Sequence, residues 1–227
     1  MARIRIVLLH ATPVAIPPIS AAFARDWPEA ETVNLLDDSL SPDRASEPEL
    51  TATMIERFVM LGHYAHSIGA DGILVTCSAF GPAIERLAAD LPIPVIKPNE
   101  AMFSEALAAG RRIGMLATFK PSIGTMETEF QEFVDRTEHP ATLTTLLVDG
   151  AMDRLRAGDP EAHNRLVAER APELGELDAV MLAHFSTSTA AEAVRRRVGI
   201  PVLTSPGSAV RHMKSLVTGG RGDSPRT

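Results

Sequence analysis

One cysteine and one histidine follow apolar segments in corresponding parts of the sequence. Cys77 comes shortly after the apolar run 73–75, and His184 comes directly after the segment 178–183, which is predicted to be a strand. A thiol can act as a thiolate base or nucleophile, and an imidazole titrates near neutral pH. Such a pair could remove a proton from a carbon atom and return one to it. The simpler alternative is that both residues are structural, as buried cysteines often are.

The surroundings of Cys77 favour a functional position. The short apolar run before it, bounded by turn residues, is typical of a buried strand in a parallel sheet, and a helix is predicted over 82–90. Cys77 would then lie at the carboxyl end of a strand and just before a helix. Ligands bind at that edge of open α/β sheets, and the N–H groups of a helix start can lower a thiol pKa or hold an anion.

An internal repeat relates the two halves of the chain. Asp71 and Asp178, Cys77 and His184, and the motifs beginning at Ile93 and Ile200 are each separated by 107 positions. The first strands are aligned through Ile4 and Ile113, which are 109 positions apart. Repetition of this kind predicts two copies of one supersecondary arrangement.

The alternation of strands and helices predicts the α/β class, with two Rossmann-like lobes that each contain a parallel sheet. We expect the first lobe over 1–108, joined by a last helix at 208–217, and the second over 109–207. A pseudo-twofold axis would relate the lobes, with the active site in the cleft between them. The segment 218–227, rich in Gly, Ser and Pro, is predicted to be a disordered tail.

Three local predictions depend on proline or polar residues. Pro13, Pro17 and Pro18 are expected to keep the chain extended before a helix near 19–25. The polar segment 37–49 is expected to be a loop. Ser122 is expected to cap a helix that runs to about residue 134.

Composition restricts the classes of function. The 227 residues are 45% hydrophobic and carry a formal net charge of −7, which argues against a nucleic-acid partner. A single cysteine rules out an internal disulfide or a cysteine-cluster metal site, and suits a reducing, cytoplasmic location. No apolar run is long enough to span a membrane. No glycine-rich nucleotide loop is present, so we expect no nucleotide cofactor. His63 and His66 lie three residues apart, but no matching acidic or cysteine cluster accompanies them, so we expect no metal.

The motifs Thr76-Cys77-Ser78 and Leu182-Ala183-His184 resemble those of the aspartate/glutamate/hydantoin racemase superfamily, which includes arylmalonate decarboxylase and maleate isomerase. The similarity extends over about 3–217. It implies two Rossmann-like lobes and cofactor-independent chemistry beside a carboxylate. Racemases of the superfamily carry a cysteine at both strand ends, whereas this chain has His184 at the second. Arylmalonate decarboxylase resembles the reverse case, with only the second cysteine.

The same resemblance implies a set of substrate-binding residues, because superfamily members bind the carboxylate through groups next to each catalytic position. These groups are backbone N–H and hydroxyl groups. The matching residues in this sequence are Thr12, Pro13, Ser78, Ala79, Thr118, Phe119, Phe185 and Ser186. The two phenylalanines would favour a less polar substrate than aspartate, or else serve only in packing between lobes.

The resemblance therefore implies an isomerase or lyase that acts at the α-carbon of a small carboxylic acid or hydantoin-like substrate. Cys77 would be the thiolate base or nucleophile, and His184 its partner acid or a replacement without a catalytic role. Two alternatives remain open: a Cys-His hydrolase or amidase that forms a thioester, and a non-catalytic protein that binds small anions. The oligomeric state also remains open, with a homo-oligomer as one alternative.

Overall fold

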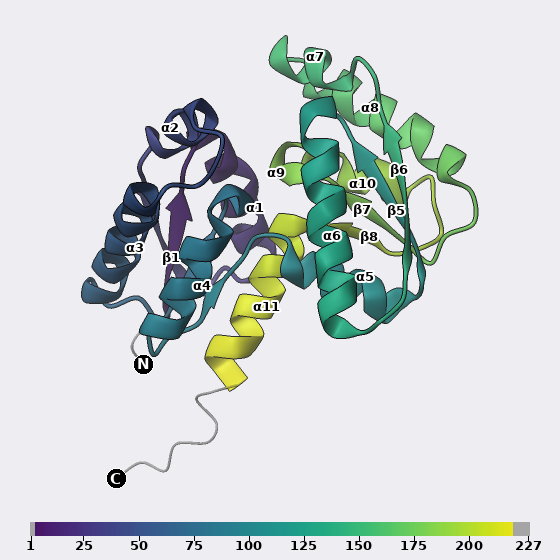
Figure 1. Cartoon of the computed structure of the whole chain (residues 1–227). Coiled ribbons are helices and arrows are strands. Elements are labelled where there is room, and N and C mark those ends of the chain that lie inside the picture. Colours follow the sequence, from purple (N-terminus) through teal and green to yellow (C-terminus); the bar gives the residue numbers. More distant parts are fainter. Residues whose placement is uncertain (1–2, 220–227) are drawn as a thin grey trace. The chain divides into compact units, whose positions relative to one another are not determined.

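The computed structural model describes residues 3–219, which form two four-stranded parallel sheets flanked by helices (Figure 1). The sheets have the strand orders β2-β1-β3-β4 and β6-β5-β7-β8, so the second repeats the first. The predicted α/β class, with one parallel sheet in each half, is confirmed. The strands of the first sheet are β1 (Arg5–His10), β2 (Glu31–Leu36), β3 (Gly72–Val75) and β4 (Val95–Ile96). Those of the second are β5 (Arg112–Ala117), β6 (Thr142–Leu147), β7 (Ala179–Leu182) and β8 (Val202–Thr204).

Helices connect and cover these strands. In the first half they are α1 (Ile16–Asp26), α2 (Leu40–Ser46), α3 (Ala52–Ser67), α4 (Gly81–Asp90) and α5 (Glu100–Ala109). In the second half they are α6 (Ile123–Thr137), α7 (Ala151–Arg156), α8 (Pro160–Arg170), α9 (His184–Thr187), α10 (Ala191–Arg195) and α11 (Ser205–Gly219). Short 3-10 turns precede several of them, among these η1 (Pro13–Ala15), η2 (Ser78–Phe80) and η3 (Lys120–Ser122).

The register of the strands corrects one detail of the predicted repeat. Ile6 pairs with Gly72, and Ile113 pairs with Ala179, so the offset of 107 applies to the first strand of each sheet as well. The alignment of Ile4 with Ile113 was therefore wrong by two residues. All four residues of β3 and all four of β7 are buried, because helices cover both faces of a parallel sheet.

The two compact units of the chain do not coincide with its two sequence halves. The first unit takes the residues up to Asn99 and those from Ala209 on, and the second takes Glu100–Ser208. Helix α5, which the sequence analysis assigned to the first lobe, supplies Met102 and Phe103 to the core of the second unit. Helix α11 ends at Gly219, so Thr218 and Gly219 are helical, and the rest of the expected tail, 220–227, lies outside the described residues.

Helix α11 packs closely on the first sheet at Gly72. A Cβ atom on Gly72 would lie 2.6 Å from Met213 Sδ, so the close approach of helix and strand requires glycine there. The last helix of each sequence half thus completes the unit of the other half.

Two local predictions were wrong. Pro17 and Pro18 lie within the first turn of α1, where the missing proline N–H is not needed for helix hydrogen bonds. Within 37–49, expected to be a loop, the structure contains α2. The Leu40 side chain of this helix is fully buried. Arg57 from α3 contacts Asp37, which precedes α2, and Asp43, which lies within it, with Nη–Oδ2 distances of 2.7 and 2.5 Å. Tertiary contacts thus stabilise a short helix that its polar sequence does not indicate.

The repeated aspartates have a structural role at the amino ends of the sheets. Asp71 Oδ2 accepts the Arg5 N–H at 2.8 Å, and Asp178 Oδ2 accepts the Arg112 N–H at 2.9 Å. Each carboxylate therefore ties the segment before the third strand to the start of the first strand. Cys77 and His184 follow the opposite, carboxyl ends of the same strands.

Candidate active site

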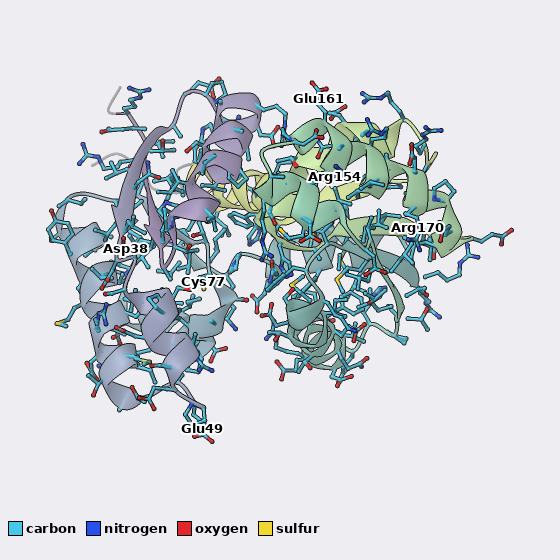
Figure 2. The ribbon with its side chains drawn as sticks, turned by 90° about the horizontal axis from the view of Figure 1, so that it is seen from above. Asp38, Glu49, Cys77, Arg154, Glu161 and Arg170 are labelled. Carbon is cyan, nitrogen blue, oxygen red and sulfur yellow. The ribbon has the colours of Figure 1, made fainter. Side chains whose placement is uncertain are left out.

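Cys77 lies two residues beyond the end of β3 and immediately precedes the turn η2. Its backbone is extended, with φ −133° and ψ 120°, and its side chain is half-buried within the first unit (Figure 2). The predicted position at a carboxyl strand end is confirmed, although η2 separates the cysteine from α4.

A buried chain of hydrogen bonds ends at Thr76, the residue before Cys77, and the sequence analysis did not predict it. His10, the last residue of β1, is fully buried and contacts Thr76 Oγ1 through Nδ1 at 2.9 Å and Asn34 Oδ1 through Nε2 at 3.0 Å. Burial lowers the pKa of His10, and the hydrogen bond with Asn34 offsets part of this effect. His10 is therefore a neutral link between three neighbouring strands, and it fixes the residue before Cys77. A histidine that ends a buried apolar strand was the available sequence signal.

His184 occupies the equivalent register after β7 but has a different backbone. Its φ is +68°, in the left-handed region, whereas that of Cys77 is −133°. Histidine is among the non-glycine residues that adopt this region, at a cost of about 1–3 kcal/mol. Such strain is commonly found at functional sites.

Ser122 is the side-chain partner of His184. Its Oγ contacts His184 Nε2 and also lies 2.7 Å from the backbone oxygen of Phe119. Ser122 is the N-cap residue of α6, as expected, but its side chain makes no capping bond: its hydroxyl bonds to these two groups instead of to a helix N–H. Burial lowers the pKa of His184, which favours the neutral imidazole.

The neighbouring predicted residues of the second unit lie at the same sheet edge. Thr118 is buried, and its Oγ1 lies 3.1 Å from Thr187 Oγ1 in α9. Phe119 is partly exposed, and the Arg156 guanidinium carbon lies 5.6 Å from its ring centroid. Because β5 and β7 are paired, the segments after them are brought together at one edge.

The remaining predicted residues also follow paired strands. In the first unit, Thr12 and Pro13 come after β1, and Ser78 and Ala79 come after the neighbouring β3. Thr12 and Ser78 are half-buried, while Pro13 and Ala79 are exposed. In the second unit, Phe185 and Ser186 form part of α9; the first is buried and the second half-buried. The structure thus brings together four predicted binding residues in each unit.

Neither a metal-binding cluster nor a membrane-spanning helix is found in the part of the chain that the structure describes. Within residues 3–219, no three His, Cys, Asp or Glu side chains are grouped so that they could hold a metal ion. No helix in the same range is long and apolar enough to cross a membrane.

These features define a class of protein: a doubled α/β fold with ionisable side chains at equivalent strand ends, a scaffold suited to acid–base chemistry. The family model described as Asp/Glu/Hydantoin racemase matches residues 10–183, and the chain belongs to this family. The protein is therefore an enzyme of the racemase type. The match includes Cys77 and ends one residue before His184.

Solved structures show the same fold over nearly the whole chain. Allantoin racemase from Klebsiella pneumoniae has a TM-score of 0.70 at 20% identity, covering 96% of this chain and 89% of its own. Glutamate racemase from Bacillus anthracis has a TM-score of 0.70 at 14% identity, with 97% and 84% covered. A variant of arylmalonate decarboxylase has a TM-score of 0.67 at 20% identity, with 95% and 94% covered. Comparison with curated protein sequences finds no match.

Proposed function

We propose that this protein is a cofactor-independent enzyme in which Cys77 and His184 exchange protons with the α-carbon of one small acidic substrate. The observation that carries the proposal is their equivalence: each follows the third strand of its sheet, in the same register, in a chain of the racemase family. An α-carbon that loses and regains a proton requires two groups of this kind.

The strand-end segments supply groups for the rest of the substrate. We assign carboxylate binding to backbone N–H and hydroxyl groups after the first and third strands, in particular those of Thr12, Ser78 and Ser186. Such donors also stabilise the negative charge that moves onto the carboxylate when the α-proton leaves, and this charge is the main obstacle to the reaction. The hydroxyl of Thr118 is held by Thr187 and serves to fix α9.

The substrate class is a small carboxylic acid or a hydantoin-like ring, and the reaction is racemisation, isomerisation or decarboxylation at the α-carbon. Proteins with this fold include an allantoin racemase, a glutamate racemase and an arylmalonate decarboxylase, which together define a panel of compounds. Partly exposed Phe119 and buried Phe185 favour members of the panel with an apolar substituent.

The experiment is α-proton exchange in deuterium oxide, followed by NMR, across amino acids, hydantoins and substituted malonates. Chiral chromatography then separates racemisation from decarboxylation. We expect exchange or carbon dioxide release with at least one compound, and its loss in Cys77→Ser, which keeps the size of the side chain. Turnover by Cys77→Ala equal to that of the wild type would refute the proposed role of the thiol.

A further inference from the structure

The contacts of Ser122 determine which nitrogen of His184 carries the proton. A serine hydroxyl has one proton to donate, and Ser122 Oγ lies against two groups, the Phe119 carbonyl oxygen and His184 Nε2. The carbonyl oxygen can only accept a hydrogen bond, whereas an imidazole nitrogen can donate or accept. Both contacts are hydrogen bonds only if the Ser122 hydroxyl donates to Phe119 and His184 Nε2–H donates to Ser122.

We infer that Ser122 is a positioning residue that holds His184 as its Nε2–H tautomer, so that Nδ1 is the atom that takes and returns the substrate proton. The chemical part of this inference rests on the proposed function, whereas the tautomer does not. Within residues 3–219, Ser122 is the sole side-chain hydrogen-bond partner of His184. The Nδ1 atom of His184 is not one of the buried side-chain nitrogen or oxygen atoms that lack a hydrogen-bond partner. In this tautomer Nδ1 is therefore a lone-pair acceptor, and no group of the described residues occupies it.

The surrounding segments hold both residues in place. The Ser122 N–H donates to the Phe119 oxygen at 3.2 Å, which closes the turn η3. On the other side, Thr187 bonds to Thr118, and the Ser188 hydroxyl donates to the Phe185 oxygen at 2.5 Å. The turn that presents His184 is thereby tied to the end of β5, and the left-handed backbone of His184 directs its ring toward Ser122.

The proton balance follows from this tautomer. When His184 is the base, its Nδ1 lone pair takes the α-proton, and the C–H bonding electrons remain on the substrate. The imidazolium keeps its Nε2–H bond to Ser122, and the Cys77 thiol donates its proton to the carbon and becomes a thiolate. In the reverse direction the thiolate takes the proton and His184 Nδ1–H returns one. The pair holds the same number of protons in both states, so no other reactant is needed.

Serine itself takes no part in the proton transfer. Its hydroxyl proton is directed to Phe119, so it is neither a nucleophile nor a relay. This distinguishes the inference from a Ser-His pair in which the imidazole accepts the serine proton.

The direct test is ¹⁵N NMR of the full-length protein labelled at histidine, above the pKa of His184. His184→Asn identifies the signals of His184. In the wild type we expect an unprotonated Nδ1 and a protonated Nε2. In Ser122→Ala we expect both tautomers, and in Ser122→Thr the wild-type pattern. The matched control is Ser67→Ala, which removes the same type of bond, from Oγ to the Tyr64 oxygen at 2.8 Å, on an exposed helix end.

Kinetics separate a positioning role from a merely structural one. With a substrate from the panel, Ser122→Ala should lower kcat about five- to tenfold with KM unchanged, the value expected for loss of one hydrogen bond. Ser122→Thr should restore most of the rate. A protonated Nδ1 in the wild type, or an unchanged tautomer in Ser122→Ala, would overturn the inference. If the NMR result holds but no compound turns over, the proposed function fails and the tautomer assignment stands.

Discussion

Cys77 and His184 occupy the same register position after β3 and β7, yet their backbones lie in different regions, with φ of −133° and +68°. The two positions are therefore equivalent in topology and distinct in local geometry. A side chain exchanged between them would meet a backbone suited to the other residue.

His184→Cys should give a less stable protein than His184→Asn. Asparagine adopts the left-handed region readily, whereas cysteine does not, and we expect a difference of about 1 kcal/mol in the free energy of unfolding. Urea titration of both variants measures this difference. Equal midpoints and slopes would show that the backbone at residue 184 is not strained.

The rate of α-proton removal by His184 should fall at acidic pH. Burial lowers the pKa of His184 below 6.5, so the neutral base persists below pH 6.5 and is lost as pH falls through the lowered pKa. A pH profile of exchange should therefore have an acidic limb set by His184. In His184→Ala that limb should disappear together with proton return, while inhibitor binding changes little. Unchanged turnover in His184→Ala would identify the histidine as structural.

Alkylation of Cys77 should abolish exchange. The half-buried thiol is the only cysteine in the chain, so iodoacetamide labels a single site that mass spectrometry can follow. A bound carboxylate inhibitor should slow labelling, because the proposed carboxylate donors adjoin Cys77. Full activity after complete labelling would contradict a catalytic thiol.

Loss of the His10 imidazole should destabilise the first unit. His10→Leu removes the partner of the Asn34 side chain and leaves Thr76 Oγ1 only its contact with the Leu9 oxygen at 3.3 Å, at an expected cost of about 1–3 kcal/mol. His10→Gln, which can both donate and accept, should cost less. Chemical denaturation at pH 7 measures the stability of both variants. A leucine variant as stable as the wild type would show that these hydrogen bonds do not stabilise the unit.

The same residue should make stability depend on pH. The folded-state pKa of His10 is lowered, so the unfolded chain binds more protons between that value and about 6.5. The contribution is present above pH 6.5 and is lost as pH falls toward the folded-state pKa. Denaturation at pH 7 and pH 5 should therefore show a smaller loss in His10→Gln than in the wild type.

The ionised Asp178 carboxylate should stabilise the second unit against acid unfolding. Hydrogen bonds from Arg112, first through its side chain and then its backbone, lower the pKa of Asp178 from 3.8 to about 2. Its stabilising effect is present above pH 3.8 and is lost as pH falls through about 2. Asp178→Asn should shift acid unfolding, followed by circular dichroism, to higher pH. Glu176→Gln, which removes a weaker contact to the same arginine at 3.5 Å, is the control.

Sequence patterns alone predict the α/β class, the repeat and the positions of Cys77 and His184 after buried strands. These features were predictable because strand burial, helix periodicity and turn residues are local signals, and because a repeat compares the chain with itself. β3 ends where the apolar run 73–75 ends, and β7 lies within one residue of the expected segment 178–183 at each end.

The contacts between side chains, in contrast, depend on how distant segments pack. The Ser122–His184 contact spans 62 residues, and the His10–Thr76 contact spans 66. Both arise where parallel neighbours end at one sheet edge, and a crossover of variable length separates such neighbours in the sequence. The left-handed backbone of His184 and the place of α5 in the second unit likewise depend on packing. No local pattern encodes them, because the groups that stabilise them are supplied by distant segments.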